Sequence, residues 1–326
     1  PGFQTIDAKE HLSHLSANER QCKPRGLALV PNGCLSSTMS DYDVIQTLAG
    51  QDGVEGSTDG LGAQASMRRP SGLCVDPTGY CYVSDTGNAS IRRISHGGMV
   101  ETVELQPTCA ADKGAIFQQP RGIAATESCL YVADSKMHRI ISISTVCGVA
   151  AGLGRVLTGQ GCRGYKDGTD ALFNGPRGLA LAPDGRLFIC DSGNYRLRCL
   201  HTHECTNHAP APVSTVAGDG AHRSRDGTLL HASFAFPYGL CWDVAGASNG
   251  LYVSEWEGHR VRRVDLGADM VYTVAGCGVA GFRDGPALAA EFDEPCMLAS
   301  DTAGNVFVAD SKNNAIRVIV GGGREG

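Results

Sequence analysis

Residues 175 to 200 read Gly-Pro-Arg-Gly-Leu-Ala-Leu-Ala-Pro-Asp-Gly-Arg-Leu-Phe-Ile-Cys-Asp-Ser-Gly-Asn-Tyr-Arg-Leu-Arg-Cys-Leu. Short apolar runs at 179–181, 187–190 and 197–200 are separated by the turn sequences Pro-Asp-Gly and Asp-Ser-Gly-Asn. This alternation predicts three short strands joined by tight turns. Because three strands alone cannot bury both faces of a sheet, such a unit requires neighbouring copies.

The same unit recurs along the chain. Its opening, Pro-x-Gly followed by Leu or Ile, occurs at Pro24, Pro70, Pro120, Pro176 and Pro237, and in degenerate form at Pro295. The second strand ends in a small residue and an acid, which in the last five units is Asp85, Asp134, Asp191, Glu255 and Asp310. A third strand follows this acid, and a fourth precedes the next proline, near 146–150 in the third unit. Six four-stranded units repeating at roughly 50 residues predict an all-β fold, a six-bladed β-propeller.

The linkers between units also repeat. Four of them contain Asp-Gly, at Asp59, Asp167, Asp226 and Asp284. An apolar residue stands three places before the next proline, at Met67, Phe117, Phe173, Phe234 and Phe292. We expect this residue to be a structural plug that packs between adjacent blades.

The two ends of the chain depart from the pattern. The last unit ends after its third strand, and residues 3–6, Phe-Gln-Thr-Ile, align with Val-Tyr-Thr-Val at 271–274. We expect a strand at 3–7 to complete the last blade, close the ring and remove the exposed sheet edges. The first unit is short and lacks the acid-containing turn. The predicted organisation is one propeller domain over residues 1–320, with blades starting near 24, 70, 120, 176, 237 and 295, and a flexible glycine-rich tail at 321–326.

Composition narrows the classes of function. The 326 residues carry a net charge of −6 at pH 7, which does not favour nucleic acid as a partner, since phosphates require a concentrated basic surface. No apolar run reaches the roughly 18 residues that a membrane span needs. The 14 cysteines include no Cys-x-x-Cys pair, which argues against a thioredoxin-like or paired zinc site. Buried free thiols are the favoured interpretation, and disulfides are the open alternative.

The repeated residues closely resemble NHL-repeat proteins. The features that carry the resemblance are Pro-Arg-Gly-Leu-Ala at 176–180, Val-Ala-Asp-Ser at 132–135 and 308–311, and the linker Thr-Val-Ala-Gly, Asp-Gly and Ala-x-Phe-x-x-Pro. The resemblance covers nearly the whole chain and implies a six-bladed propeller. It specifies architecture more than activity, because related propellers serve many roles.

A ring of candidate binding residues follows from the predicted topology. Up-and-down strands place the Pro-x-Gly entries, the acid turns and the Asp-Gly linkers on one rim. The middle residue of Pro-x-Gly then lies near the axis in every blade: Arg25, Ser71, Arg121, Arg177, Tyr238 and Cys296. Because guanidinium groups bind carboxylate and phosphate through bidentate hydrogen bonds, Arg25, Arg121 and Arg177, with Tyr238, form a candidate partner- or anion-binding rim. In the structural alternative, these arginines pair with the repeat acids Asp134 or Asp191.

Metal sites are not predicted. The repeat acids stand singly, without the closely spaced oxygen ligands of calcium, and we expect them to accept backbone N–H groups in their turns. His201, His203, Cys205 and His208 have donor types that suit zinc. They lie in an insertion on the face opposite the arginines, for which an exposed polar loop is the alternative interpretation.

The chain contains no Gly-x-Ser-x-Gly, His-Glu-x-x-His or phosphate-binding glycine motif. The inner strands are apolar, for example at 73–75, 123–125 and 179–181. We therefore predict no catalytic residues and no cofactor. The favoured function is a non-catalytic protein–protein interaction platform, a monomeric propeller acting as scaffold subunit or domain of a larger assembly. The alternatives are a small-molecule binder or metal-dependent lyase or hydrolase at the channel mouth, which the resemblance implies, and an RNA-binding propeller.

Overall fold

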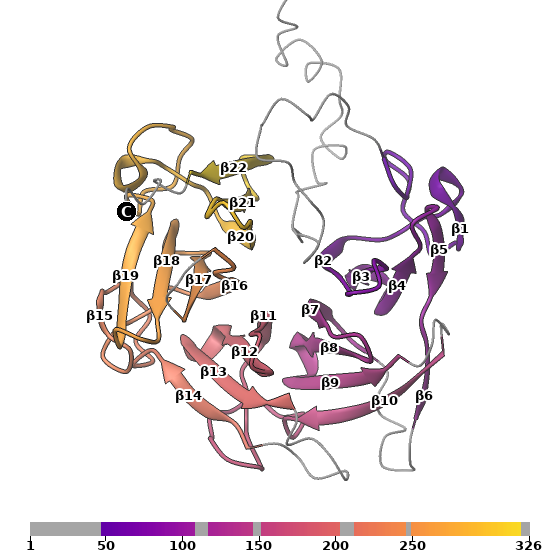
Figure 1. Ribbon diagram of the computed structural model, residues 1–326, viewed down its shortest axis with the longest axis horizontal. Coiled ribbons are helices and arrows are strands. Elements are labelled where there is room, and N and C mark those ends of the chain that lie inside the picture. The colour runs from indigo at the N-terminus through magenta and orange to yellow at the C-terminus, as the bar shows by residue number, and fades with distance from the viewer. Residues whose placement is uncertain (1–46, 108–116, 146–150, 203–211, 246–248, 321–326) are drawn as a thin grey trace, which may run out of the picture.

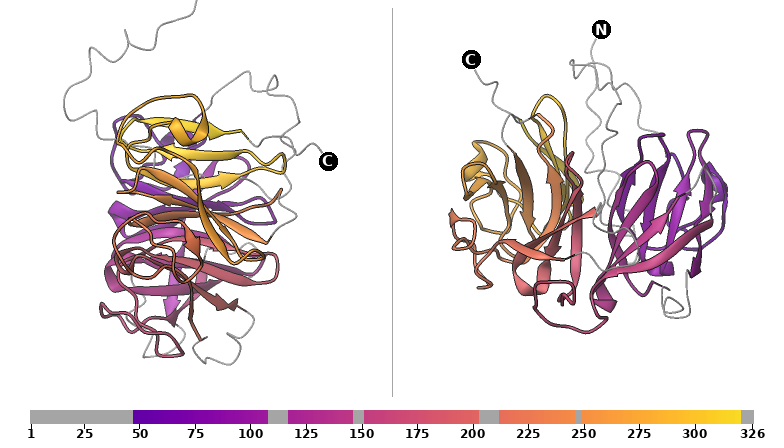
Figure 2. Two further views of the ribbon diagram at one scale, coloured as in Figure 1. Left: turned by 90° about the vertical axis from the view of Figure 1, so that its left-hand side faces the viewer. Right: turned by 60° about the horizontal axis from the view of Figure 1, so that its bottom comes forward.

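The computed structural model describes residues 47–107, 117–145, 151–202, 212–245 and 249–320. These residues form five sheets arranged around a central axis in the manner of a propeller (Figure 1). Figure 2 shows the same ring from two other sides, with the sheets of successive blades stacked face to face. Each blade is named by the proline that opens its innermost strand.

The strands of each blade follow one another from the axis outwards, and in three blades a short strand from a linker adds to the outer edge. The Pro70 blade comprises β2 (Pro70–Val75), β3 (Cys81–Asp85), β4 (Ser90–Ile94), β5 (Met99–Thr102) and β1 (Gly60–Leu61). The Pro120 blade comprises β7 (Pro120–Ala125), β8 (Cys129–Asp134), β9 (Arg139–Ser144), β10 (Ala151–Thr158) and β6 (Glu104–Pro107). The Pro176 blade comprises β11 (Pro176–Leu181), β12 (Arg186–Asp191), β13 (Arg196–His201) and β14 (Ser214–Ala217).

The last two blades continue this order. The Pro237 blade comprises β16 (Pro237–Trp242), β17 (Gly250–Glu255), β18 (Arg260–Asp265), β19 (Met270–Ala275) and β15 (Gly227–Thr228). The Pro295 blade comprises β20 (Pro295–Ser300), β21 (Val306–Asp310) and β22 (Ala315–Ile319). Single-turn 3₁₀ helices occupy several connections: η3 (Gly62–Gln64), η4 (Thr86–Asn88), η6 (Ser135–Met137), η7 (Ser192–Asn194) and η9 (Ala287–Ala289). No helix in this part of the chain is long and apolar enough to cross a membrane.

The predicted propeller is confirmed, with five blades in the described residues where the sequence predicted six. The blade expected near Pro24, the closing strand at 3–7 and the tail at 321–326 all lie outside the described residues. The last blade has three strands in the structure, as expected from the sequence. The outer strand of the Pro120 blade, expected near 146–150, lies at 151–158 instead, because β10 pairs with both β9 and the linker strand β6 there.

The glycine of Pro-x-Gly is required by close packing around the axis. A Cβ atom on Gly122 would lie 1.9 Å from the carbonyl oxygen of Arg177 in the next blade, and one on Gly72 would lie 1.9 Å from that of Arg121. Gly239 meets the carbonyl of Cys296 in the same way. Neighbouring inner strands therefore touch backbone to backbone, which a side chain at this position would prevent.

The plug residues pack as predicted. Phe117, Phe173, Phe234 and Phe292 are each at most 3% exposed, and Met67 is partly buried against the Pro70 blade core. Phe234 packs in one cluster with Phe188 and Leu197 of the Pro176 blade and with Leu240 of its own. The other three phenylalanines also lie in clusters drawn from two blades, so each of these four linkers fills the space between two blades with one apolar side chain.

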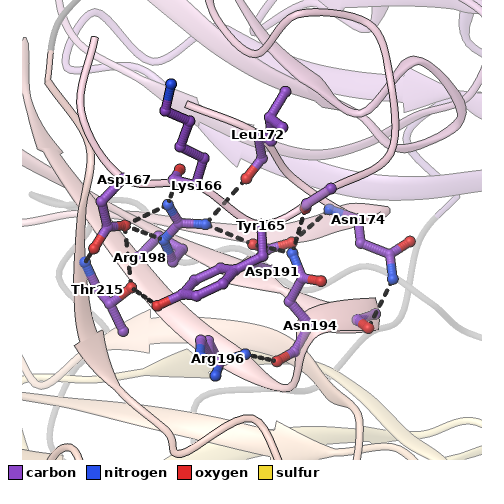
Figure 3. Close-up of polar contacts among 12 residues, drawn as sticks. Tyr165, Lys166, Asp167, Leu172, Asn174, Asp191, Asn194, Arg196, Arg198 and Thr215 are labelled. Atoms are coloured by element: carbon purple, nitrogen blue, oxygen red, sulfur yellow. Dashed lines mark hydrogen bonds and ion pairs between the residues drawn. The ribbon is translucent and has the colours of Figure 1, made fainter. Parts of the chain in front are cut away.

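In all but one of the described blades, a buried arginine on the third strand joins the linker to the blade (Figure 3). The sequence did not predict this feature. In the Pro176 blade, Arg198 donates from Nη1 to Asp191 at 2.8 Å and from Nη2 to Asp167 of the linker at 2.5 Å. It also donates to the backbone carbonyls of Lys166 and Leu172 at 2.7 and 3.2 Å. One fully buried guanidinium therefore satisfies two carboxylates and two carbonyls at the point where the chain enters the blade.

The same arrangement recurs in three other blades, and the Pro120 blade is the exception. The equivalent arginines, each with its repeat acid and its linker aspartate, are Arg92 with Asp85 and Asp59, Arg262 with Glu255 and Asp226, and Arg317 with Asp310 and Asp284. In the Pro120 blade Ile141 occupies this position on β9, opposite Val132. The linker before that blade has no Asp-Gly dipeptide, so the sequence lacks this dipeptide in the same unit that lacks the arginine.

The repeat acids accept backbone N–H groups, but these come from the linker and not, as the sequence had predicted, from the acids' own turns. Asp85 accepts from the amide of Arg68 at 2.7 Å, and Asp191 accepts from that of Asn174 at 2.8 Å. Both donors lie two residues before the proline of the same blade. The acid therefore anchors the linker to the blade, which explains its recurrence without invoking calcium.

Candidate binding site at the axial mouth

The structure describes five of the six residues that the sequence placed around the axis. Arg121, Arg177 and Tyr238 come together in one cluster. Ser71 instead shares a hydrogen bond with Thr86 at 2.5 Å, and Cys296 is buried, with its thiol donating to the carbonyl of Glu294. Arg25 lies outside the described residues. We call the cluster of Arg121, Arg177 and Tyr238 the axial mouth.

Arg121 reaches across the mouth to a blade that is not its immediate neighbour. Its Nη1 donates to the hydroxyl of Tyr238 at 2.8 Å, past the Pro176 blade that stands between them. The side chain is mostly buried, since Arg121 is only 9% exposed, and its Nε has no hydrogen-bond partner. Tyr238 is 2% exposed, so its phenol is held in place as the acceptor.

Arg177 lies against aromatic rings rather than acids. Its Cζ is 4.7 Å from the ring centroid of Tyr238 and 4.8 Å from that of Phe236, distances at which a cation interacts with the π face. Its Nε is buried and has no hydrogen-bond partner. The guanidinium is therefore positioned by packing, while part of its hydrogen-bonding capacity is unused.

The expected pairing of these arginines with the repeat acids is wrong. Asp191 pairs with Arg198 at 2.8 Å, and Asp134 pairs with Arg139 at 3.4 Å. Pro176, not Arg177, is the register partner of Asp191, and neighbouring residues of a strand point to opposite faces. Among the residues that the structure describes, no carboxylate forms an ion pair with Arg121 or Arg177.

The mouth arginines differ from the buried arginines of the blades, because the described residues give the mouth arginines no carboxylate partner. Burial lowers the pKa of Arg177, and the nearby charge of Arg121 lowers it further, while the phenol of Tyr238 opposes both effects. Arginine nevertheless stays protonated at neutral pH. The mouth therefore holds two neighbouring positive charges that an anion would stabilise.

Three further aromatic side chains continue the site outwards, and the sequence reading did not include them. Phe236 packs on Trp256 with ring centroids 5.5 Å apart, and Trp256 lies 6.4 Å from Tyr238. Tyr195, at the end of the η7 turn, lies 6.4 Å from Phe236. The signal for one of them was present, since the Pro237 blade has Trp256 in place of the small turn residue that follows the repeat acid.

The channel beyond the mouth is apolar, as predicted from its inner strands. A cavity of about 200 Å³ is lined by residues of all five inner strands. They include Leu73, Ile123, Leu179, Leu240 and Leu298. In the described part of the channel the lining side chains are therefore mostly apolar, while Ser300 and exposed backbone groups add polar contacts.

The candidate zinc ligands are only partly described. His201 ends β13, whereas His203, Cys205 and His208 lie outside the described residues. Within the described ranges, no group of three or more His, Cys, Asp or Glu side chains is placed to hold a metal. The nine cysteines in these ranges are all free thiols, and burial raises the pKa of Cys199 to about 11 and of Cys241 to about 12.

Comparisons with known proteins support the repeat architecture. The family model described as NHL repeat matches residues 173–200. The chain is 29% identical over 286 residues to Protein SUPPRESSOR OF QUENCHING 1, chloroplastic, of Arabidopsis thaliana, an alignment covering 83% of this chain and 26% of that protein. It is 26% identical over 296 residues to NHL repeat-containing protein 2 of Bos taurus, covering 81% of this chain and 40% of that protein. The chain thus spans well under half the length of these relatives.

Among solved structures, the chain is similar to a chain in the crystal structure of a nidogen/laminin complex. The TM-score is 0.54 at 19% identity, covering 79% of this chain and 78% of that chain. At this level of identity the likeness shows the fold alone.

Proposed function

Because this chain belongs to the NHL-repeat family, we propose that it is a non-catalytic platform for protein–protein interaction that receives its partner at the axial mouth. In this proposal it acts as a scaffold subunit or as a domain of a larger assembly. The rigid ring supplies the support, and the residues of the rim supply the specificity.

One observation carries the proposal: Arg121 and Arg177 are partly or largely buried together without a carboxylate among the described residues. Every other arginine buried within the blades has an acidic partner, as Arg92, Arg198 and Arg262 do. Two adjacent cations without a counter-charge cost stability, and a partner that brings an anion removes that cost. Arg, Tyr and Trp, which gather here, are also the residues that dominate binding energy at protein interfaces.

Affinity purification followed by quantitative mass spectrometry tests this function. The intact chain is compared with an Arg121→Gln/Arg177→Gln variant and with Arg186→Gln, a control that removes an arginine paired with Asp184 in a distant turn. We expect stoichiometric partner proteins with the wild type and the control, and their loss with the double variant at unchanged folding. Equal recovery by all three proteins would exclude the axial mouth as the interface.

The apolar channel favours a second candidate, the binding of a small molecule. The cavity of about 200 Å³ has room for a small apolar group below the arginines. Native mass spectrometry of the purified protein tests this candidate, which requires a retained mass that is lost when Leu179→Trp fills the channel.

For the fold itself we propose the complete ring of six blades, with residues 3–7 as the outer strand of the Pro295 blade. The supporting observation is that β22 pairs only with β21 among the described residues, while Ile316 and Val318 on β22 are 51% and 43% exposed and Val320 just after it is 70% exposed. Beside this edge lies a cavity of about 240 Å³ lined by Asp284, Phe292 and Arg317. An apolar strand paired with β22 would cover both.

A further inference from the structure

Two aromatic residues, Phe236 and Trp256, adjoin the axial mouth. Phe236 contacts the guanidinium of Arg177, and Trp256 packs on Phe236. Both aromatic side chains are partly exposed, whereas most large apolar side chains nearby are buried. The cationic groups and the aromatic rings therefore form one continuous surface rather than two separate patches.

The backbone at Phe236 follows the pattern of the repeat. Phe236 has φ of +59°, and the equivalent residues before the opening prolines, Arg69, Gly175 and Glu294, have φ of +51°, +60° and +54°. The left-handed conformation therefore belongs to the turn before the proline. In the Pro237 blade this turn carries an aromatic side chain, which lies against Arg177.

The charges at and around the axial mouth favour a single carboxylate over a polyphosphate as the ligand. The mouth provides two guanidinium groups in the described residues, while exposed Glu257 and partly exposed Glu294 lie on the neighbouring turns and linkers. A polyphosphate chain would meet these acids and a protein of net charge −6. A single carboxylate that enters between Arg121 and Arg177 would meet only the positive groups.

On the basis of the proposed function, we propose that the axial mouth together with Phe236 and Trp256 binds an extended protein segment that carries a carboxylate side chain followed closely by an aromatic or long aliphatic side chain. The carboxylate pairs with the guanidinium groups of Arg121 and Arg177, which have no carboxylate partner among the described residues. The apolar side chain packs on the exposed part of Trp256 and Phe236.

The spacing of the two features in the ligand follows from the distances in the site. Arg177 is 4.8 Å from the Phe236 centroid, and Phe236 is 5.5 Å from that of Trp256. An extended chain advances about 3.3 Å per residue, so the carboxylate and the apolar side chain should be two or three residues apart. A spacing of two places both side chains on the same side of an extended segment, and a spacing of three requires the segment to twist between them.

A random peptide library displayed on phage, selected on the intact chain, tests the proposal. Peptides that also bind the Arg121→Gln/Arg177→Gln variant are removed, and the remaining peptides are synthesised and measured by fluorescence anisotropy. We expect Asp or Glu two or three residues before Phe, Tyr, Trp or Leu. Each single replacement Arg121→Gln, Arg177→Gln or Trp256→Ala should weaken binding about tenfold or more. Arg186→Gln is the matched control and should bind as the wild type does.

Substituted peptides separate the possible ligands. Replacing the acidic residue by Asn should abolish binding, and replacing it by phosphoserine should weaken it. Tighter binding of the phosphoserine peptide, or of an oligouridylate that competes at the mouth, would overturn the carboxylate proposal. Selection of peptides without acidic residues would overturn it as well. If partner capture depends on both arginines but no acidic peptide binds, the proposed function stands and this inference fails.

Discussion

Arg198 shows how much of a propeller blade depends on one charged side chain. Its guanidinium is fully buried and contacts Asp191, Asp167 and two backbone carbonyls. Removing it would leave Asp191 buried without its counter-charge, and the cost of such a change is far above that of breaking an exposed pair.

We predict that Arg198→Leu lowers the free energy of unfolding by about 3–5 kcal/mol. The control Arg186→Leu breaks the pair with Asp184, whose side chain is 53% exposed, and should cost less than about 1 kcal/mol. Urea denaturation of the three proteins measures the difference. Equal losses would contradict a role for Arg198 beyond that of a surface ion pair.

A second single residue, His138, connects the Pro120 blade to the linker of the Pro176 blade. His138, at the end of the η6 turn, accepts the backbone N–H of Gly175 at its Nδ1, at 2.9 Å. The pKa of His138 is lowered from its ordinary 6.5, first by burial and then by the charge of Arg163, while Asp191 and Asp134 oppose the shift. A lowered pKa means that the unfolded chain binds the proton more tightly than the folded one.

We predict that acid weakens this connection. The contribution of neutral His138 to stability is complete above the unfolded pKa of about 6.5. It is lost as the pH falls through the lower pKa of His138 in the folded protein. His138→Asn should lower the dependence of stability on pH between roughly 7 and 5, since Asn does not titrate there. Asn is a fitting replacement because Asn314, the equivalent residue of the Pro295 blade, adopts the same φ of +51°. Parallel pH dependences of the two proteins, measured by thermal unfolding, would show that His138 is not the group that titrates.

At the scale of the element, a threonine on the fourth strand of three blades contacts the linker acid, and the described residues of the Pro295 blade provide no such threonine. The hydroxyl of Thr102 donates to Asp59 at 3.0 Å, and those of Thr215 and Thr273 donate to Asp167 and Asp226 at 3.1 Å. In the Pro295 blade, Asp284 binds Arg317 but is 82% exposed, against 51% or less for the other three linker acids. The sequence aligns Thr5 with Thr273.

We therefore predict that Thr5 interacts with Asp284. Thr5→Val should lower the free energy of unfolding by about 1 kcal/mol in the wild type and have almost no effect in an Asp284→Ala background. Denaturation of the two single variants and the double variant measures this coupling. Gln4→Ala, one residue away, provides the control, and additive losses for Thr5 and Asp284 would exclude the closing strand.

At the scale of the whole molecule, the blades and the mouth place buried arginines in opposite surroundings. Arginines within the blades are paired with acids, whereas those at the mouth feel each other's charge and contact a phenol and aromatic rings. Sites that bind a partner commonly keep such an unfavourable arrangement in the free protein.

This contrast predicts that Arg121→Met/Arg177→Met, unlike Arg198→Leu, leaves the free energy of unfolding unchanged or raises it by up to about 2 kcal/mol. Removing two like charges offsets the lost hydrogen bond to Tyr238 and the lost ring contacts. Urea denaturation of the isolated chain measures the effect. A loss comparable with that of Arg198→Leu would assign the mouth arginines to stability rather than to binding.

Repetition in the amino-acid sequence was enough to determine the blades. The Pro-x-Gly openings, the acid turns and the plug residues recur at fixed places because each blade meets the same neighbours in the same way. The strands, the burial of Phe173 and Phe234 and the apolar channel followed from that repetition. A local pattern that determines local contacts can be read without the tertiary structure.

Which side chains meet across the axis was decided only by the tertiary structure. Arg121 and Tyr238 stand in blades that are not adjacent, and their hydrogen bond depends on the radius and tilt of the ring. The partner of Asp191 likewise depended on strand register, which gave it Arg198 and left Arg177 for the mouth. The sequence by itself determined the repeated architecture, because each repeat encodes its own turns and core. The binding site was decided in three dimensions, because it is made from the residues at which the repeats differ.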